Sequence, residues 1–237
     1  SLSPSERHRA VGPGAELALD WERAGINDPH VWQQRVRAKL IELSGYGRFG
    51  GPPGINRLCD LPDRDGFKHR SLYLKVRDGL DLPIRMIWDP SIEADKSVPA
   101  MICLQGTNSG IHLSWGDVRL PIDVERIARG SENALQAVAR GYMAVAVEQS
   151  CFGERREIHL AKVSSDPCID AANHALLLGR TLLGERASDV SAVITWLVGG
   201  AHGLSFDLSR LHIMGNSSGG STALYASALD LRIRALL

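Results

Sequence analysis

The chain has 237 residues, of which 44% are apolar, and its 27 basic residues balance its 27 acidic residues to a formal net charge of zero. A nucleic-acid-binding protein usually carries a basic excess, and a membrane-spanning helix needs about 20 apolar residues in a row, so the sequence predicts neither nucleic-acid nor membrane partners. The polar residues 1–14 lack the apolar core of a secretion signal, and we therefore expect a cytoplasmic location.

The cysteines form no CxxC pair and have no histidine at the spacing of a zinc site. They are Cys59, Cys103, Cys151 and Cys168. We expect free, buried thiols in a reducing compartment, and neither a metal nor another cofactor.

The first 66 residues predict a helical, loop-rich extension. Residues 1–14 are expected to be a flexible lead-in and residues 15–25 a weak helix. A stronger helix should run from Asp28, which can cap it, to Gly45, which can end it. The Gly- and Pro-rich residues 47–66 are expected to form a loop. Two helices bury too little apolar surface to fold alone, so we expect the extension to pack on the rest of the chain.

Residues 67–237 predict an α/β domain with three layers. Apolar residues alternate over 72–76 and 82–88 around the turn at Asp78-Gly79, which indicates an antiparallel hairpin. Short apolar runs at 98–104, 142–149, 210–214 and 231–237 are typical of strands buried on both faces. Helices are expected between them, at 123–140, 170–183 and 185–198. This alternation predicts a mostly parallel sheet covered by helices on both faces.

The stretch Gly215-Asn216-Ser217-Ser218-Gly219 is a G-x-S-x-G motif between a predicted strand and a predicted helix. In this context the serine occupies a sharp, strained turn that exposes its hydroxyl above the sheet. Ser217 has glycines at both flanks, and a register centred on Ser218 does not. The alternative is a glycine-rich helix start that caps the helix or binds an anion. Ser217 is the predicted nucleophile.

A second loop follows the strand at 98–104 and runs from Gln105 through Gly110. In a hydrolase with such an elbow, this loop supplies one backbone N–H to the oxyanion, and the residue after the nucleophile supplies the other. We assign these roles to Thr107 and Ser218, with Gln105 and Asn108 as candidate pocket residues. An ordinary connecting loop remains the alternative.

A third loop follows the strand at 142–149 and should reach the same sheet edge. Glu148, Gln149 and Cys151 are its candidate pocket residues. Cys151 has no evident base beside it, so it is not expected to be the nucleophile. Glu154 stands next to Arg155 and Arg156, and we expect an ion pair there rather than acid–base chemistry.

With these motifs in hand, residues 67–237 resemble the α/β-hydrolase superfamily, and most closely the branch of acetyl xylan esterases and dienelactone-hydrolase-like proteins. The resemblance implies a serine carboxylic-ester hydrolase acting on a small or acetyl ester. Two departures stand out. Gln105 occupies a position where relatives commonly have histidine, and the chain stops before the positions of the family's acid and histidine.

Every histidine precedes Ser217; the eight are His8, His30, His69, His112, His159, His174, His202 and His212. His212 is expected to be structural, and His112 is the nearest candidate for a substitute base. Because the acid and the base follow the nucleophile in this fold, we expect both beyond Leu237. The sequence therefore predicts an incomplete hydrolase that lacks about 60–120 residues.

Two other functions stay open. The scaffold could cleave amides, as prolyl-oligopeptidase-type peptidases do, or it could bind a ligand without catalysis. The substrate and the oligomeric state are not predicted.

Overall fold

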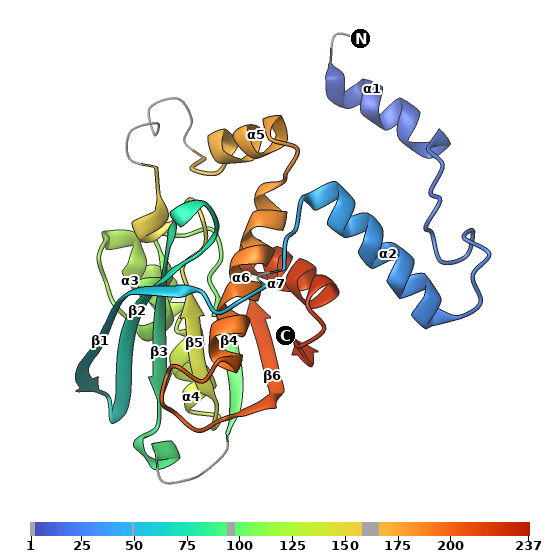
Figure 1. Cartoon of the computed structure of the whole chain (residues 1–237). Coiled ribbons are helices and arrows are strands. Elements are labelled where there is room, and N and C mark those ends of the chain that lie inside the picture. Colours follow the sequence, from blue (N-terminus) through green and yellow to red (C-terminus); the bar gives the residue numbers. More distant parts are fainter. Residues whose placement is uncertain (1–2, 49, 94–97, 158–165) are drawn as a thin grey trace. The chain divides into compact units, whose positions relative to one another are not determined.

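The computed structural model describes residues 3–48, 50–93, 98–157 and 166–237 (Figure 1). The chain divides into two compact units, residues 1–40 and 41–237. The first contains the helix α1 (Pro4–Val11), a short 3-10 turn at Gly12–Gly14, and most of α2 (Pro29–Ser44). The predicted helix over 28–45 is confirmed as α2.

Two expectations for the first unit are wrong. Residues 4–11 are helical rather than a flexible lead-in, with Pro4 in the first turn, where its missing N–H costs nothing. Residues 15–25 contain no helix. The Asp20 carboxylate there accepts hydrogen bonds from the backbone N–H groups of Glu22 and Arg23, which favours a turn over a helix. Whether residues 1–66 pack on the rest as an extension stays a prediction.

The second unit is built on a seven-stranded mixed sheet with the strand order β1-β2-β3-β5-β4-β6-β7. The strands β4 to β7 are parallel to one another, and β1, β2 and β3 add an antiparallel flank. Their bounds are β1 (Gly54–Arg64), β2 (Phe67–Lys75), β3 (Asp81–Trp88), β4 (Pro99–Leu104), β5 (Met143–Val147), β6 (Asp207–Gly215) and β7 (Ala235–Leu236). The predicted hairpin is confirmed as β2 and β3.

The loop expected at 47–66 is wrong for residues 54–64, which form β1. This strand lies at the edge of the sheet and most of its side chains are exposed, so the sequence has no apolar alternation to reveal it. Its pairing with β2 is also irregular, with register shifts between Ile55 and Arg57 and between Leu61 and Arg64. Such shifts twist an edge strand and protect it from pairing with another chain.

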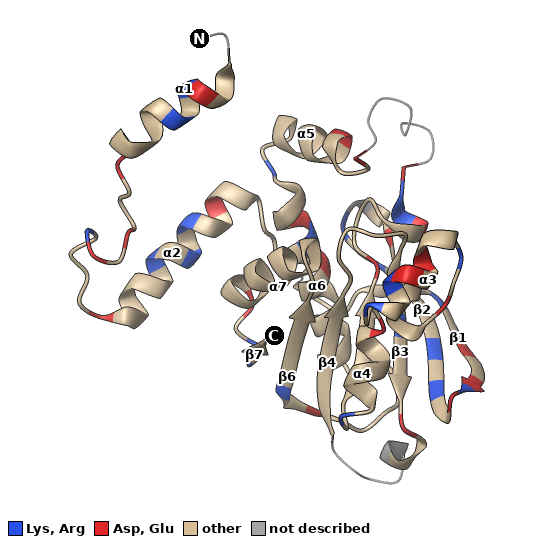
Figure 2. Ribbon diagram, turned by 180° about the vertical axis from the view of Figure 1, so that it is seen from behind, with Lys and Arg blue, Asp and Glu red and all other residues tan. Residues whose placement is uncertain are grey.

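Helices cover both faces of the sheet (Figures 1 and 2). The helix α4 packs on β3, β4 and β5, while α7 packs on β4 and β6 and against α6. Figure 2 shows charged residues on β2 and α3 but none on β4. The helices of this unit are α3 (Pro121–Ala128), α4 (Asn133–Val138), α5 (Ile169–Leu177), α6 (Leu182–Val198) and α7 (Ser218–Leu229).

Two helix boundaries differ from the expectation. The single helix expected at 123–140 is two helices, because Gly130 adopts a φ of +83° that ends α3. The break expected between residues 183 and 185 lies earlier, between α5 and α6. The reason is that Thr181 caps α6 by accepting a hydrogen bond from the Gly184 N–H at 3.0 Å. In the part of the chain that the structure describes, no helix has both the length and the apolar character needed to cross a lipid bilayer.

The core lies on both sides of β4 and β5, whose residues Ala100–Leu104 and Met143–Val147 are all buried. Alternate side chains point to opposite faces, so Met101, Cys103 and Ala144 pack with α4, and their neighbours in the strands face the α6 and α7 side. Burial on both faces explains the continuous apolar runs in the sequence. It also holds the carboxyl ends of the central strands in fixed positions.

Candidate active site

Ser217 occupies a sharp turn between β6 and α7. Its backbone has φ 52° and ψ −117°, a conformation that residues other than glycine rarely adopt. Such strain persists only where the surrounding structure enforces it, and it is concentrated at functional sites. Ser217 itself is exposed, and the turn therefore presents its hydroxyl at the end of the sheet.

The flanking glycines are required by the close crossing of chain segments. A Cβ atom at Gly215 would lie 2.3 Å from the backbone carbonyl carbon of Gly219. A Cβ atom at Gly219 would lie 2.5 Å from the carbonyl oxygen of Gln105 and 2.6 Å from that of Leu104. All three distances are too short for any side chain, so the two glycines let α7 begin directly against β6 and the end of β4.

A cavity of about 330 Å³ opens beside Ser217. It brings together the predicted nucleophile, the predicted oxyanion residue Thr107, and the candidate pocket residues Gln105 and Asn108. No large apolar side chain belongs to its described lining. The lining residues are Gln105, Gly106, Thr107, Asn108, Arg126, Arg129, Gly130, Ser131, Asn133, Asn216 and Ser217.

The loop after β4 lies directly against the turn at Ser217. The Asn216 N–H donates to the Leu104 carbonyl at 3.4 Å, and a Cβ atom at Gly106 would lie 3.4 Å from Ser217 Cβ. Ser218 is the first residue of α7, so its N–H has no partner within the helix. The Thr107 N–H likewise donates no hydrogen bond among the described residues. Two backbone N–H groups close to Ser217 in this part of the structure are thus without a protein partner.

Gln149 does not line the cavity, but it contacts the lining residue Gln105. Its Nε2 donates to the Gln105 carbonyl at 2.5 Å, and its Oε1 accepts from the Thr222 hydroxyl of α7 at 2.6 Å. The side chain is buried and bridges the loop after β4 to the helix that carries Ser217. Its role in this structure is to hold those two elements together.

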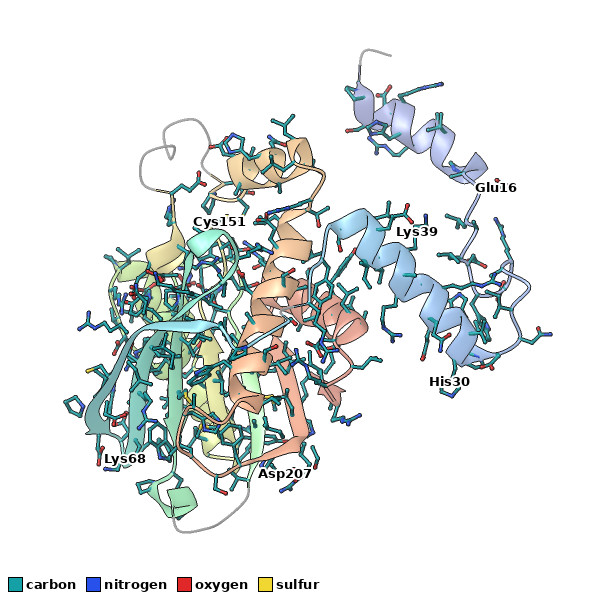
Figure 3. All side chains as sticks on the ribbon, in the orientation of Figure 1. Glu16, His30, Lys39, Lys68, Cys151 and Asp207 are labelled. Atoms are coloured by element: carbon teal, nitrogen blue, oxygen red, sulfur yellow. The ribbon has the colours of Figure 1, made fainter. Side chains whose placement is uncertain are left out.

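Cys151, labelled in Figure 3, is buried and does not belong to the described lining of the cavity. Burial, with a smaller contribution from nearby Cys168, raises the pKa of its thiol to about 12. The thiol is therefore protonated at neutral pH and is not a nucleophile. All four cysteines are free, but only Cys103 and Cys151 are buried, so the expectation of buried thiols is wrong for Cys59 and Cys168.

The ion pair expected for Glu154 is not found among the described residues. Glu154 accepts a hydrogen bond from the Tyr73 hydroxyl at 2.5 Å, and Arg155 pairs instead with Asp189 on α6 at 2.8 Å. The turn at Gly153–Arg155 aims neighbouring side chains in different directions, which adjacency in sequence does not reveal.

Glu148 is an acid buried at the end of β5, with 1% of its surface exposed. Burial raises its pKa to about 7, against the opposing effects of hydrogen bonds from the Ile111 and Glu154 N–H groups. Neighbouring Glu154 raises the pKa and Arg155 lowers it. Glu148 does not line the cavity, but its carboxyl group accepts a hydrogen bond from Gln105 Nε2 at 2.5 Å.

The raised pKa of Glu148 predicts a loss of stability toward high pH. A folded-state pKa of about 7 exceeds the ordinary value of 4.5, so the stabilising contribution is fully present below pH 4.5 and is lost as the pH rises through 7. Glu148→Gln should remove this dependence. Between pH 4.5 and pH 8 its free energy of unfolding should gain on that of the wild type by up to about 3 kcal/mol. Urea unfolding at both pH values measures this, and parallel pH profiles would contradict it.

His112 is not placed to act as a base on Ser217. It is buried, and its Nε2 lies 2.9 Å from Asp123 Oδ2. Burial alone would raise the pKa of Asp123, but hydrogen bonds from Ser109, His112 and backbone N–H groups outweigh it and lower the pKa. His212 contacts the Tyr142 hydroxyl at 3.2 Å, as expected of a structural residue. No histidine among the described residues lines the cavity, and His159 lies outside them.

Sequence reasoning missed one wall of the cavity. It consists of Arg126 and Arg129 at the end of α3, the turn at Gly130, and Asn133 in α4. Both arginines also approach carboxylates of their own helix: Arg126 lies 3.6 Å from Asp123, and Arg129 pairs with Glu125. The only available signal was Gly130-Ser131, which marks a break inside the helix that we expected to be continuous.

Comparison with known proteins gives structural neighbours only: no family model matches the chain, and no curated protein matches it in sequence. A protein from Bacteroides fragilis NCTC 9343, provisionally assigned as an acetyl xylan esterase, superposes with a TM-score of 0.77 at 20% identity over 100% of this chain and 60% of its own. The acetyl xylan esterase of Paenibacillus sp. R4 superposes with a TM-score of 0.52 at 16% identity, and the match covers 89% of this chain and 58% of its own.

A glucuronoyl esterase from Solibacter usitatus gives a TM-score of 0.56 at 16% identity, with 88% of this chain and 58% of its own. The chain thus spans about three fifths of the length of these structures. With the strand order and the flanking helices, these likenesses give the fold: the domain is an α/β-hydrolase fold of the type seen in these esterases.

Proposed function

We propose that the protein is a carboxylic-ester hydrolase that works through an acyl-enzyme on Ser217. The observation that carries this proposal is the strained turn at Ser217, an exposed residue in the lining of a cavity. A serine that merely capped α7 would not need a φ of 52°. The esterase neighbours support the same chemistry by analogy of fold.

In the proposed reaction the Ser217 oxygen attacks the ester carbonyl and its proton passes to a general base. The negative charge that develops on the carbonyl oxygen is stabilised by the N–H groups of Thr107 and Ser218. The C–O bond to the alcohol then breaks, and the alcohol leaves with the proton. Water hydrolyses the acyl-Ser217 ester by the same steps in reverse order. The general base is not among the residues that line the described cavity.

The proposed substrate is a small or acetyl ester of a polar compound. The described wall of the cavity consists of polar, charged and glycine residues, which offer hydrogen bonds but little surface to a long acyl chain. The names of the neighbours, acetyl xylan and glucuronoyl esterases, point to esters of carbohydrates. Amide cleavage and ligand binding without catalysis are the competing functions.

Labelling with a fluorophosphonate tests the proposal on the full-length protein. The wild type should form one covalent adduct, and Ser217→Ala should form none. Ser218→Ala is the matched control, because the Ser218 hydroxyl is buried behind the turn and its substitution keeps the backbone donor. Labelling that survives Ser217→Ala would exclude Ser217 as the nucleophile, and an unlabelled wild type would favour the binding scaffold.

A comparison of substrates separates the two hydrolase classes. An aryl acetate should be cleaved at least about 100-fold faster than the matching aryl anilide, because the amine is the poorer leaving group and must be protonated by a positioned acid. Rates of initial hydrolysis at equal concentrations measure this ratio. Equal or faster cleavage of the anilide would support a peptidase instead.

A further inference from the structure

The buried acid Glu148 has no place in the reaction proposed above, although it lies directly below the proposed oxyanion loop. Its backbone N–H donates to the Pro83 carbonyl of β3 at 3.0 Å, which extends the sheet by one residue past β5. The main chain of Glu148 is therefore held as firmly as a strand. A buried carboxyl group is costly unless its oxygens accept hydrogen bonds, so its contacts are informative.

Those contacts join the two ends of one loop. Glu148 Oε1 accepts from Gln105 Nε2 at 2.5 Å, at the start of the loop after β4. The Ile111 N–H, at the end of the same loop, lies 3.1 Å from Oε1 and 3.2 Å from Oε2. Thr107, whose N–H is the proposed oxyanion donor, stands between these two attachment points.

Two glycines make room for this carboxyl group. Gly153 adopts a φ of +49°, and a Cβ atom there would lie 2.0 Å from Glu148 Oε2. Gly110 adopts a φ of +152°, and its Cβ atom would lie 2.8 Å from Gly153 Cα and 3.3 Å from the same oxygen. The loops after β4 and β5 thus close over the carboxyl group with no space for a side chain.

We propose that Glu148 is a positioning residue for ester hydrolysis: its carboxyl group ties Gln105 to Ile111 and so holds the Thr107 N–H in place beside Ser217. The inference rests on the proposed function. The next residue supports the same loop from the other side, because Gln149 binds the Gln105 carbonyl and Thr222 of α7. Two consecutive residues after β5 thereby fix the loop relative to both the sheet and the helix of the nucleophile.

The test is steady-state kinetics of variants in the full-length protein with a small acetate ester. An oxyanion donor acts mainly in the transition state, so Glu148→Ala should lower kcat about 10- to 100-fold and leave KM within about threefold. Glu148→Asp retains the carboxyl group but withdraws its oxygens from both donors, so it should lose activity to a similar extent. Glu148→Gln retains one acceptor oxygen at the same reach and should keep at least about a third of kcat.

Asp189→Asn is the matched control. Asp189 is also a buried carboxylate near this sheet edge. It pairs with Arg77 and with Arg155, which also donates to the main-chain carbonyl of Glu148 at 3.1 Å, but among the described residues it makes no hydrogen bond to the loop after β4. The Asp189→Asn protein should unfold more easily than the wild type, but when folded it should have the kcat and KM of the wild type. Near-ultraviolet circular dichroism at the assay temperature verifies folding, and Glu148→Asp serves if Glu148→Ala does not fold.

The outcomes separate the inference from the function on which it rests. A folded Glu148→Ala or Glu148→Asp protein with kcat within threefold of the wild type would overturn the positioning role. An equal loss in Asp189→Asn would also overturn it, because the effect would then be one of general destabilisation. A wild-type protein without Ser217-dependent ester hydrolysis would instead overturn the proposed function, and the inference with it.

Discussion

Ser217→Ala should lower kcat/KM for ester hydrolysis by at least about 10⁴-fold, because no covalent acyl intermediate can form without the hydroxyl group. This is the largest effect on activity that we expect from a single substitution. The fold should be unaffected, since Ser217 is exposed and its hydroxyl caps no helix N–H. Alanine also adopts a φ of 52° no less readily than serine does.

Initial rates on a chromogenic acetate measure this loss, with urea unfolding alongside. Ser221→Ala is a suitable control, since Ser221 is an exposed serine of the same helix, one turn further on. It should retain the kinetics of the wild type. If Ser217→Ala kept more than a tenth of wild-type kcat/KM, the acyl-enzyme mechanism on Ser217 would have to be abandoned.

Gly219→Ala should lower the free energy of unfolding strongly, although it adds only one methyl group. The added methyl group would lie 2.5 Å from the Gln105 oxygen and 2.6 Å from the Leu104 oxygen, and both belong to the backbone of a buried segment. We expect the free energy of unfolding to fall by about 2–4 kcal/mol, although alanine is the better helix former. Activity should fall as well, because relief of the clash moves α7 away from β4.

Gly220→Ala controls for the helix itself. A Cβ atom at Gly220 comes no closer than 3.2 Å to the Gly215 oxygen, so its effect on the free energy of unfolding should stay within about 1 kcal/mol. Urea unfolding of both variants gives the comparison. Equal stabilities for the two variants would show that Gly219 is not needed for the crossing of α7 over the end of β4.

The elements buried on both faces were the most predictable from sequence. The strands β4 and β5 read as continuous apolar runs, and β2 and β3 as alternating ones, because burial dictates their side chains. The edge strand β1 could not be predicted from the sequence. Its pairing uses backbone groups, and its mostly exposed side chains show no apolar alternation. Gly130 did not predict the break between α3 and α4, because an isolated glycine is tolerated inside many helices.

For the candidate site, the sequence identified the residues that need a special backbone, and it could not identify those that act through space. Ser217 and its glycines were readable because the sharp turn restricts the residue types that fit it. The contact between Glu148 and Gln105 joins the residues that directly follow two different strands, and only the register of β4 against β5 brings them together. The arginines of α3 carry no motif, and their place at the cavity follows from the helix break alone.

The strand order has a consequence for how the protein is made. In the parallel part of the sheet, β4 lies between β5 and β6, and Met101 pairs with His212, 111 residues later in the sequence. During synthesis one edge of this apolar strand therefore lacks its native partner until the residues of β6 have been made. Pairing between residues far apart in the sequence slows folding and prolongs the lifetime of aggregation-prone intermediates. We expect the nascent chain to depend on chaperones until β6 emerges, and its yield to fall sharply when synthesis outpaces them.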